Sequence, residues 1–521
     1  MKKRVLSMLL TCAMGASLIA GCGGSGSSNE TAGNDTAAQE TADTASEEKA
    51  EATEDAGEAE STEEAAESTD AAASGDVVTL KWVTIGSGMP DNYDSWAATL
   101  NEYLAEKIGV NIEMEVISWG DWDNRRNIII STNEPYDIIF GNGGNFTSDV
   151  ALGAYYDISD LVKDNMPGLT ALMPETYWDA VTVDGKVYGV PTYKDSSLSN
   201  YDIWDAELVD EYSLDIDDLA KSLDAKTEIF TQLKADKNDY PVYVKNDGLY
   251  YIFDKYDQLG AGLQILGVRY DDKDAKVCLT LEQDDIFSEL KTIHQWYEDG
   301  IINSDASTLS EGRVYNMWRV AQGWPSAAVT AWGPQMGKDV KVSQIGETIL
   351  SNDTVRGSLN MVSANTQYPE KCLQFLDLVN TDTKVRDLFY YGEEGVNFQY
   401  TADGKVEKLN EDWTMAGYTQ GTFFTVTQNA ADEFNQWDEV KELNENATPS
   451  VLLGFTFDTT EVSDQLANCT EIWSRYKSEV ITGVQDPETA VPEIKAELEA
   501  AGWDELVAAA QAQVDEFMAS K

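Results

Sequence analysis

Apolar and polar positions repeat with two different periods along the chain from residue 77 onward. Runs that are β-branched or alternate every two residues predict strands, and apolar residues at every third or fourth position predict helices. The strands are expected at 77–85, 110–117 and 136–140, and the helices at 92–108 and 121–130. Gly109 stands where it would end the first helix. This alternation predicts an α/β fold with a largely parallel sheet, whose ligands would sit beyond the carboxyl ends of the strands.

Further along, the pattern predicts a hairpin and then a more helical region. A hairpin is expected over 182–191, because Asp184-Gly185 suits the backbone of a tight turn. The strongest helical stretches are 215–235 and 284–297, and the apolar run at 326–334 predicts a short strand and a turn. Trp82 and Trp96 fall on the apolar sides of a strand and a helix, so both are expected in the core.

The N-terminus has the composition of an export signal. Three basic residues at 2–4 precede an apolar stretch, 5–20, that is too short for a good membrane-spanning helix. It ends in Ile19-Ala20-Gly21-Cys22, which resembles the lipobox of bacterial lipoproteins. The resemblance implies a signal peptide over 1–21 and acylation of the Cys22 thiol, which would anchor the chain to the outer face of the cytoplasmic membrane. The alternative is an ordinary signal peptide followed by a chance cysteine.

Residues 22–76 form a low-complexity segment after this signal. They carry 16 acidic residues, one base (Lys49) and no aromatic residue. Such a segment buries too little apolar surface to offset its chain entropy, so we expect a disordered acidic tether.

Composition removes several classes of function. The 521 residues carry a formal net charge of −57, which argues against nucleic acid and against electrostatic attraction to an anionic membrane. A single histidine, His294, excludes sites that need two, and is expected to be structural. No two of the five cysteines have C-x-x-C spacing, and neither a P-loop nor a G-x-S-x-G elbow occurs. No cofactor, no metal site and no enzymatic activity are expected.

Four stretches in a fixed order resemble the extracellular solute-binding lipoproteins of bacterial ABC importers. The likeness is to the family-1, carbohydrate-type group, in its long form with an extra C-terminal domain. The stretches are Trp119-Gly120-Asp121-Trp122-Asp123 with 134–140, Tyr177-Trp178-Asp179-Ala180 with 183–191, 363–382, and 391–398. The tail, with Gly454-Phe455-Thr456-Phe457-Asp458, is similar to the extra domain.

The resemblance implies a periplasmic-binding-protein-like fold of type II, with two discontinuous lobes joined by a hinge. We expect crossovers near 191–197 and 323–328. Lobe one would then comprise 77–193 plus 327–382, and lobe two 194–326 plus 383–450. The segment 451–521 would be helical and complete either lobe.

The resemblance also implies a ligand held between the lobes, most simply an oligosaccharide, and permease subunits as partners. Aromatic rings suit the C–H faces of sugars, and carboxylates and amides suit their hydroxyls. Candidate ligand-binding residues stand in loops after predicted strands, at the crossovers, or in the matched loop at 391–398: Met89, Asp91, Asn142, Tyr193, Trp332, Glu393 and Asn397. Hinge packing is an equal alternative for Tyr193.

Two other classes of function stay open. Paired carboxylates could hydrolyse glycosides at the cell surface. Because the chain has 93 acidic residues, the spacing of two carboxylates in the sequence does not separate a catalytic pair from a chance pair. A lipid-anchored adhesin would also carry a signal and a tether. Among ligands, a peptide or another small polar solute remains an alternative to an oligosaccharide.

Overall fold

The computed structural model describes residues 77–521. The expected signal peptide, the lipid attachment at Cys22 and the acidic tether lie outside the described residues.

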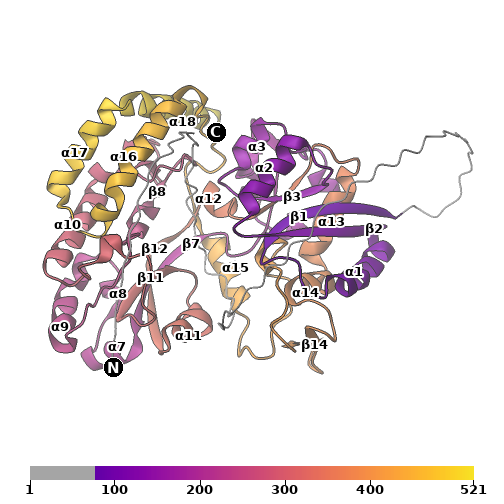
Figure 1. Cartoon of the computed structure of the whole chain (residues 1–521), viewed down its shortest axis with the longest axis horizontal. Coiled ribbons are helices and arrows are strands. Elements are labelled where there is room, and N and C mark those ends of the chain that lie inside the picture. Colours follow the sequence, from indigo (N-terminus) through magenta and orange to yellow (C-terminus); the bar gives the residue numbers. More distant parts are fainter. Residues whose placement is uncertain (1–76) are drawn as a thin grey trace, which may run out of the picture. The chain divides into compact units, whose positions relative to one another are not determined.

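A five-stranded sheet, in the order β2-β1-β3-β13-β6, organises the first lobe (Figure 1). β1, β2 and β3 are parallel, and β13 runs antiparallel to both β3 and β6. The strands are β1 (Val78–Gly86), β2 (Val110–Ser118), β3 (Ile138–Gly141), β6 (Val190–Pro191) and β13 (Leu359–Val362). The predicted strands and the largely parallel sheet are confirmed.

The helices of the first lobe bury one face each against this sheet. They are α1 (Tyr93–Ile108), α2 (Trp122–Thr132), α13 (Pro369–Thr381) and α14 (Thr383–Tyr391). α1 ends at Gly109, whose φ of 65° lets its N–H bond back to the carbonyl of Ala105. Trp82 and Trp96 are fully buried, as predicted. Their rings lie 5.6 Å and 5.2 Å from the ring of Phe389 on α14, so α14 is part of the first core.

A second, four-stranded sheet has the order β11-β7-β12-β16. Its strands are β7 (Leu198–Asp205), β11 (Trp318–Gln322), β12 (Val340–Leu350) and β16 (Thr448–Pro449). β7 is antiparallel to both of its neighbours. Its side chains alternate as a strand requires: Trp204 enters the large second core, while Tyr201 and Ile203 enter a small cluster on the other side.

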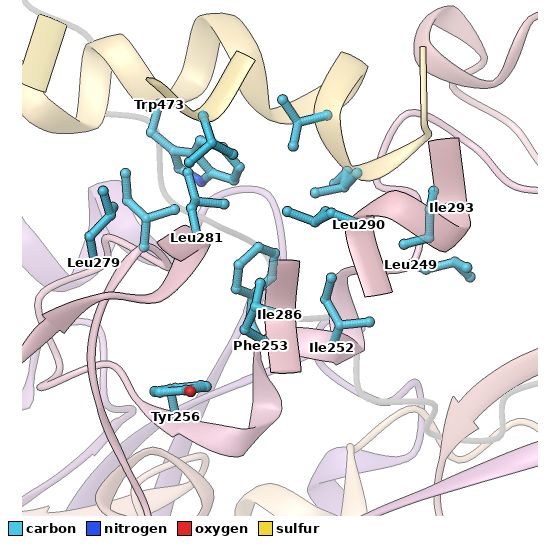
Figure 2. Close-up of a cluster of buried hydrophobic side chains, with 14 of the residues drawn as sticks. Leu249, Ile252, Phe253, Tyr256, Leu279, Leu281, Ile286, Leu290, Ile293 and Trp473 are labelled. Atoms are coloured by element: carbon cyan, nitrogen blue, oxygen red, sulfur yellow. The ribbon is translucent and has the colours of Figure 1, made fainter. Parts of the chain in front are cut away.

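The C-terminal helices complete the second lobe. They are α16 (Ser463–Ile481), α17 (Pro487–Ala500) and α18 (Trp503–Ser520). α16 and α17 lie beside α10 (Asp284–Glu298), and α18 packs on α16 and α17 (Figure 1). Figure 2 shows Trp473 of α16 above Leu281 and Leu290, in the same core as Phe253, whose ring is 6.1 Å away. His294 donates from Nδ1 to the carbonyl of Gly483 at 2.8 Å, so the single histidine is structural, as predicted.

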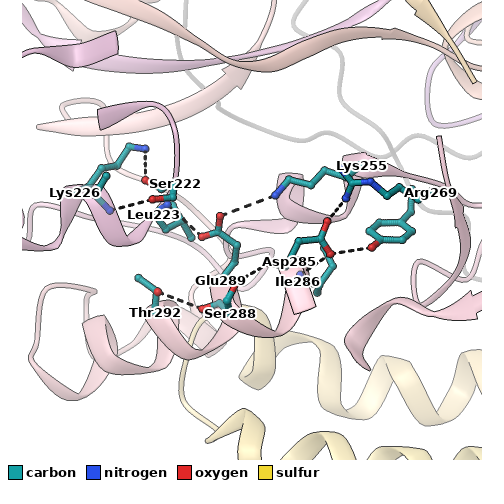
Figure 3. A network of polar contacts seen from close by, with 12 residues as sticks. Ser222, Leu223, Lys226, Lys255, Arg269, Asp285, Ile286, Ser288, Glu289 and Thr292 are labelled. Atoms are coloured by element: carbon teal, nitrogen blue, oxygen red, sulfur yellow. Dashed lines mark hydrogen bonds and ion pairs between the residues drawn. The ribbon is translucent and has the colours of Figure 1, made fainter. Parts of the chain in front are cut away.

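The predicted helix at 215–235 is interrupted. The chain forms α8 (Ile216–Leu219), a 3-10 turn (Asp224–Lys226) and α9 (Thr227–Lys237). Lys226 is 1% exposed and donates from Nζ to the carbonyls of Leu219 and Ser222, which would otherwise lack partners at the break. Figure 3 shows the bond to Ser222 at one end of a polar network that continues through Leu223 to Glu289.

The apolar run at 326–334 is helical, and the predicted strand there is wrong. A one-turn π-helix (Ala328–Trp332) continues into α11 (Gly333–Met336). Trp332 and Met336 are four positions apart, so one helical face carries both into the small cluster with Tyr201.

The chain crosses between the lobes three times. The first crossing, between Pro191 and Leu198, coincides with the expected one. The second lies between Leu350 and Leu359 and contains α12 (Asn352–Val355), rather than lying near 323–328, because both β11 and β12 pair with β7. The third includes α15 (Gln436–Asn446), which leads into β16.

These crossings move two expected boundaries. Residues 327–350 belong to the second lobe, since β12 is a strand of its sheet. Residues 383–426 belong to the first, since α14 packs into its core. The segment 451–521 is helical from α16 onward and completes the second lobe.

Short elements connect these parts. In the first lobe they are α3 (Phe146–Ala151), α4 (Val162–Asn165), α5 (Pro167–Leu172), α6 (Thr176–Asp179), β4 (Thr182–Val183), β5 (Lys186–Val187), β14 (Phe398–Tyr400) and β15 (Val406–Lys408). In the second they are α7 (Ala206–Tyr212), β8 (Tyr256–Asp257), β9 (Leu266–Arg269) and β10 (Cys278–Leu279). β4 and β5 pair around Asp184 and Gly185, both at positive φ, which confirms the predicted hairpin.

Candidate binding site

One edge of the first sheet collects the ends of all five strands. The registers align Gly86 with Ser118, and Leu359 with both Gly141 and Pro191. The carboxyl ends of β1, β2, β3 and β6 therefore meet the amino end of β13 at this edge, which is where an α/β sheet places a ligand.

An exposed tryptophan stands at this edge directly after β2. The side chain of Trp119 is 47% exposed, and its ring stacks on that of Tyr418 with centroids 6.0 Å apart and planes 16° apart. The Trp119 indole N–H also donates to the Ser87 hydroxyl after β1, at 3.4 Å. Two strand ends thus hold the Trp119 ring with one face on Tyr418 and a large part of its surface open.

Tyr418 comes from a distant segment that the strand ends fix in place. It lies in a 3-10 turn (Gly417–Thr419). Its carbonyl accepts from the Ser358 hydroxyl at 3.1 Å, and the carbonyl of Thr419 accepts from the Asn360 amide at 3.0 Å. Lys194, in the first crossing, places its Nζ 5.5 Å from the Tyr418 ring centroid, and Asp195 neutralises it at 2.6 Å.

Further aromatic rings continue from Tyr418 toward the second lobe. Tyr390 packs close against Gly417, next to Tyr418, and its ring lies 5.9 Å from that of Phe423. Phe423 stacks on Trp437 of α15 at 4.2 Å, and Trp437 lies 5.8 Å from Trp324, which follows β11 in the second lobe. We call this set the aromatic line: Trp119, Tyr418, Tyr390, Phe423, Trp437 and Trp324.

Two carboxyls near the crossings have perturbed acidity. Asp254 is half-buried and accepts from the Asn200 amide at 2.8 Å, at the amino end of β7. Burial raises its pKa to about 7, although the Asn200 bond opposes this. Asp353 on α12 is exposed on one side, and its pKa is raised to about 6 because the protein on its other side displaces water and Asp257 adds a like charge, which Arg356 partly offsets. Both groups can accept hydrogen bonds from hydroxyl groups.

The Asp254→Asn variant should flatten the pH dependence of stability. The unfolded carboxyl titrates near 3.9. Between about pH 4 and pH 7 the folded state therefore holds a proton that the unfolded state has lost, so the free energy of unfolding falls as pH rises through this window. Urea midpoints at pH 5, 6, 7 and 8 should fall less in the variant than in wild type. The matched control is Asp403→Asn, which removes a carboxyl whose pKa is lowered and should keep the wild-type slope. Equal slopes for Asp254→Asn and wild type would contradict the assignment.

Three of the sequence-predicted residues lie in loops at the same sheet edge. Met89 is 41% exposed and its Sδ accepts from the Val116 N–H at 3.3 Å. Asp91 is exposed after β1. Asn142 is half-buried after β3, and its side-chain oxygen accepts from the Gly144 N–H. Asp91 and Asn142 thus add polar groups to the loops at the sheet edge that carries Trp119.

Of the other four, three are buried and Glu393 is half-buried. Tyr193 is fully buried, edge-on to Phe424 at 4.6 Å, so it packs at the first crossing, which was the alternative interpretation. Trp332 is 2% exposed in the small cluster. Asn397 is 2% exposed and accepts from the Asn92 amide at 2.8 Å. Glu393 accepts from the Ser95 hydroxyl at 2.6 Å. These bonds tie the 391–398 loop to the start of α1.

Within residues 77–521, no group of three or more histidine, cysteine, aspartate or glutamate side chains is arranged to hold a metal ion. Of the helices in the same residues, none has the length and apolarity needed to span a bilayer.

Two discontinuous lobes, three crossings and a ligand edge on the first sheet define a type II solute-binding fold. Residues 98–445 match the bacterial extracellular solute-binding protein family, and the chain belongs to this family. Residues 451–519 match a domain of unknown function.

Known proteins from one species are similar over most of the chain. A carbohydrate ABC transporter substrate-binding protein of Streptococcus pneumoniae is 27% identical over 473 residues, which are 87% of this chain and 93% of that protein. The crystal structure of the N-glycan transport solute binding protein of S. pneumoniae is similar with a TM-score of 0.76 at 25% identity, covering 85% of this chain and 99% of the other. Its complex with Man5GlcNAc gives a TM-score of 0.63 over the same shares.

Proposed function

We propose that this chain is the solute-binding component of an ABC importer, and that it captures an oligosaccharide between its two lobes. The observation that carries the proposal is the aromatic line, which begins at the exposed Trp119 on the first lobe and ends at Trp324 on the second. The names of its relatives support the same class of ligand, since one is a carbohydrate transporter component and another was crystallised with Man5GlcNAc.

The aromatic line and its neighbours match the two chemical aspects of a sugar. The apolar C–H face of a pyranose ring packs on a flat aromatic ring, and Trp119 offers one held in place by Tyr418. Hydroxyl groups need acceptors and donors, which Asp91 and Asn142 supply at the strand ends of the first sheet and Asp254 supplies at the amino end of β7 in the second lobe. A ligand that contacts both lobes stabilises the arrangement in which both sets of contacts form, so binding shifts the population toward it.

The experiment is a thermal-shift screen of the full chain against mono- and oligosaccharides, with peptides and polyols as controls. A ligand present at a hundred times its Kd adds about 2.7 kcal/mol to the free energy of unfolding, which is easily seen. We expect a shift that is selective for oligosaccharides, with the sugar recovered intact. Cleavage of the sugar would indicate a glycoside hydrolase instead, and a shift with peptides alone would contradict the proposed ligand class.

Membrane attachment through Cys22 is part of this proposal, and the sequence Ile19-Ala20-Gly21-Cys22 supports it. The Cys22→Ser variant should lose its acyl chains and pass from the membrane fraction into the medium or periplasm, because a serine hydroxyl does not replace the thiol as lipid acceptor. The measurement is fractionation with intact-mass analysis of the mature chain. A Cys22→Ser chain that stays in the membrane fraction would contradict lipid anchoring at this residue.

A further inference from the structure

The loop that leads from β16 into the C-terminal helices contacts the cores of both lobes. Leu452 is fully buried in the core of the second lobe, and the next residue, Leu453, is buried in the core of the first. Phe455 returns to the second core, where its ring lies 5.5 Å from that of Phe517 on α18. We call residues 450–456 the joint loop. Adjacent side chains of one short loop are therefore fixed in two different lobes.

Asn352 on the second crossing holds this loop with three hydrogen bonds. Its amide nitrogen donates to the carbonyls of Leu452 at 3.0 Å and Phe455 at 2.9 Å. Its side-chain oxygen accepts from the N–H of Gly454 at 2.9 Å. Asn352 is 5% exposed, so all three bonds are shielded from water. Gly454 has a φ of 91°, which suits the tight turn that points these groups at Asn352.

Arg356, one helical turn later, links the same loop to the first lobe. It is 3% exposed and donates from Nε to the carbonyl of Ala180, which follows α6. Its terminal nitrogen donates to the Thr456 hydroxyl at 3.1 Å. On the other side, the Ser450 hydroxyl donates to Asp257 at 2.8 Å, and the carbonyl of Val451 accepts from Lys521 at the end of α18. The loop is thus bonded to the crossing, to both lobes and to the C-terminal helices.

We propose that Asn352 and Arg356 are positioning residues: through the joint loop they couple the C-terminal domain to the second crossing, so that this domain sets the relative orientation of the lobes and thereby ligand affinity. The proposal gives a role to the segment that matches a domain of unknown function. None of these residues belongs to the aromatic line. The expected effect on ligand affinity rests on the function proposed above.

The physical basis is the number of orientations open to the lobes. The three covalent crossings alone would let one lobe rotate relative to the other. A loop with side chains buried in both cores restricts the range of that rotation. If the bonds to the joint loop are lost, the lobes also adopt orientations in which Trp119 and Trp324 cannot both contact the ligand. The apparent affinity then falls in proportion to the fraction of molecules that can still bind. A positioning role therefore predicts weaker binding from a change that touches no ligand-binding side chain.

The test compares Asn352→Ala with a matched control, Asn303→Ala. Asn303 is 1% exposed and also makes three hydrogen bonds, two with the backbone of Val244 and one with Asp305, all within the second lobe. Both variants should lose stability in urea. Only Asn352→Ala should raise the Kd for the oligosaccharide that binds wild type, by about fivefold or more, which is the usual lower range of coupling between distant sites.

A second readout needs no ligand. Spin labels at Leu152→Cys and Val314→Cys, which are both 73% exposed and lie in different lobes, report the distance between the lobes by pulsed EPR. The full chain then carries Cys12→Ser, Cys22→Ser and Cys278→Ser, and the buried Cys372 and Cys469 are kept. Asn352→Ala should broaden or shift the distance distribution, and Asn303→Ala should leave it unchanged. If Asn352→Ala does not fold, Thr456→Val, which removes only the bond from Arg356, should shift distances and Kd in the same direction by less.

The outcomes separate the two proposals. Unchanged distances in Asn352→Ala and Thr456→Val would overturn the inference, as would a rise in Kd that Asn303→Ala reproduces. If wild type binds no oligosaccharide, the proposed function fails, but the distance measurement still decides whether the joint loop orients the lobes.

Discussion

Replacing Trp119 by alanine is expected to raise the Kd for the bound oligosaccharide by about thirtyfold, or roughly 2 kcal/mol, as for a tryptophan at the centre of an interface. Trp119 presents a 47% exposed ring that is already fixed by Tyr418 and by Ser87, so little side-chain entropy is lost when a sugar packs on it. Alanine removes this surface and leaves only the smaller ring of Tyr418 to contact the sugar. Isothermal titration calorimetry with the glycan found in the screen measures the effect.

The matched control is Tyr368→Ala. Tyr368 is 43% exposed, close to the exposure of Trp119, but it follows Val362 at the opposite end of β13. This change should leave Kd within about twofold, since surface changes away from a site usually cost little. The Kd of Trp119→Phe should lie between those of wild type and Trp119→Ala, because phenylalanine keeps a smaller flat ring. Equal Kd values for Trp119→Ala and wild type would contradict the proposal that the aromatic line is the binding surface.

The strands and helices of the first sheet could be predicted because their signals are local. The period of apolar residues identifies β1, α1 and β2, and Gly109 ends α1 through its own backbone geometry. The run at 326–334 could not be assigned, because a short apolar run suits a strand or a buried helix equally until Tyr201 packs against it. The second crossing could not be placed either, since it depends on the pairing of β12 with β7, which no local pattern records.

The site shows the same division between local and distant signals. Met89, Asp91 and Asn142 follow strands directly, and the rule that ligands lie beyond carboxyl ends finds their loops. Trp119 follows β2 in the same way, but a tryptophan directly before a predicted helix carries no local signal that separates ligand binding from packing. Tyr418 carries no local signal, because only the folded chain brings it to the strand ends.

The largest loss of stability is expected from breaking the buried ion pair between Lys226 and Asp202. Lys226 Nζ lies 2.9 Å from Asp202 Oδ2, and the two side chains are 1% and 0% exposed. The Trp318 indole N–H donates to the other carboxylate oxygen at 2.8 Å, and Nζ also satisfies two carbonyls at the break before α9. Lys226→Met leaves the carboxylate uncompensated in the second core, which should cost about 3–5 kcal/mol in the free energy of unfolding.

A double-mutant cycle, measured by urea unfolding, separates the effect of the unpaired charge from the effect of changed packing at Lys226 and Asp202. Lys226→Met with Asp202→Asn should be less destabilised than the sum of the two single changes, because no unpaired charge remains, although the carbonyls of Leu219 and Ser222 still lose their donor. The control is Lys237→Met, which breaks the pair with Glu211, where the side chains are 30% and 53% exposed. That change should cost less than about 1 kcal/mol. Similar losses for Lys226→Met and Lys237→Met would mean that solvent reaches the inner pair, and that the second core is not sealed around it.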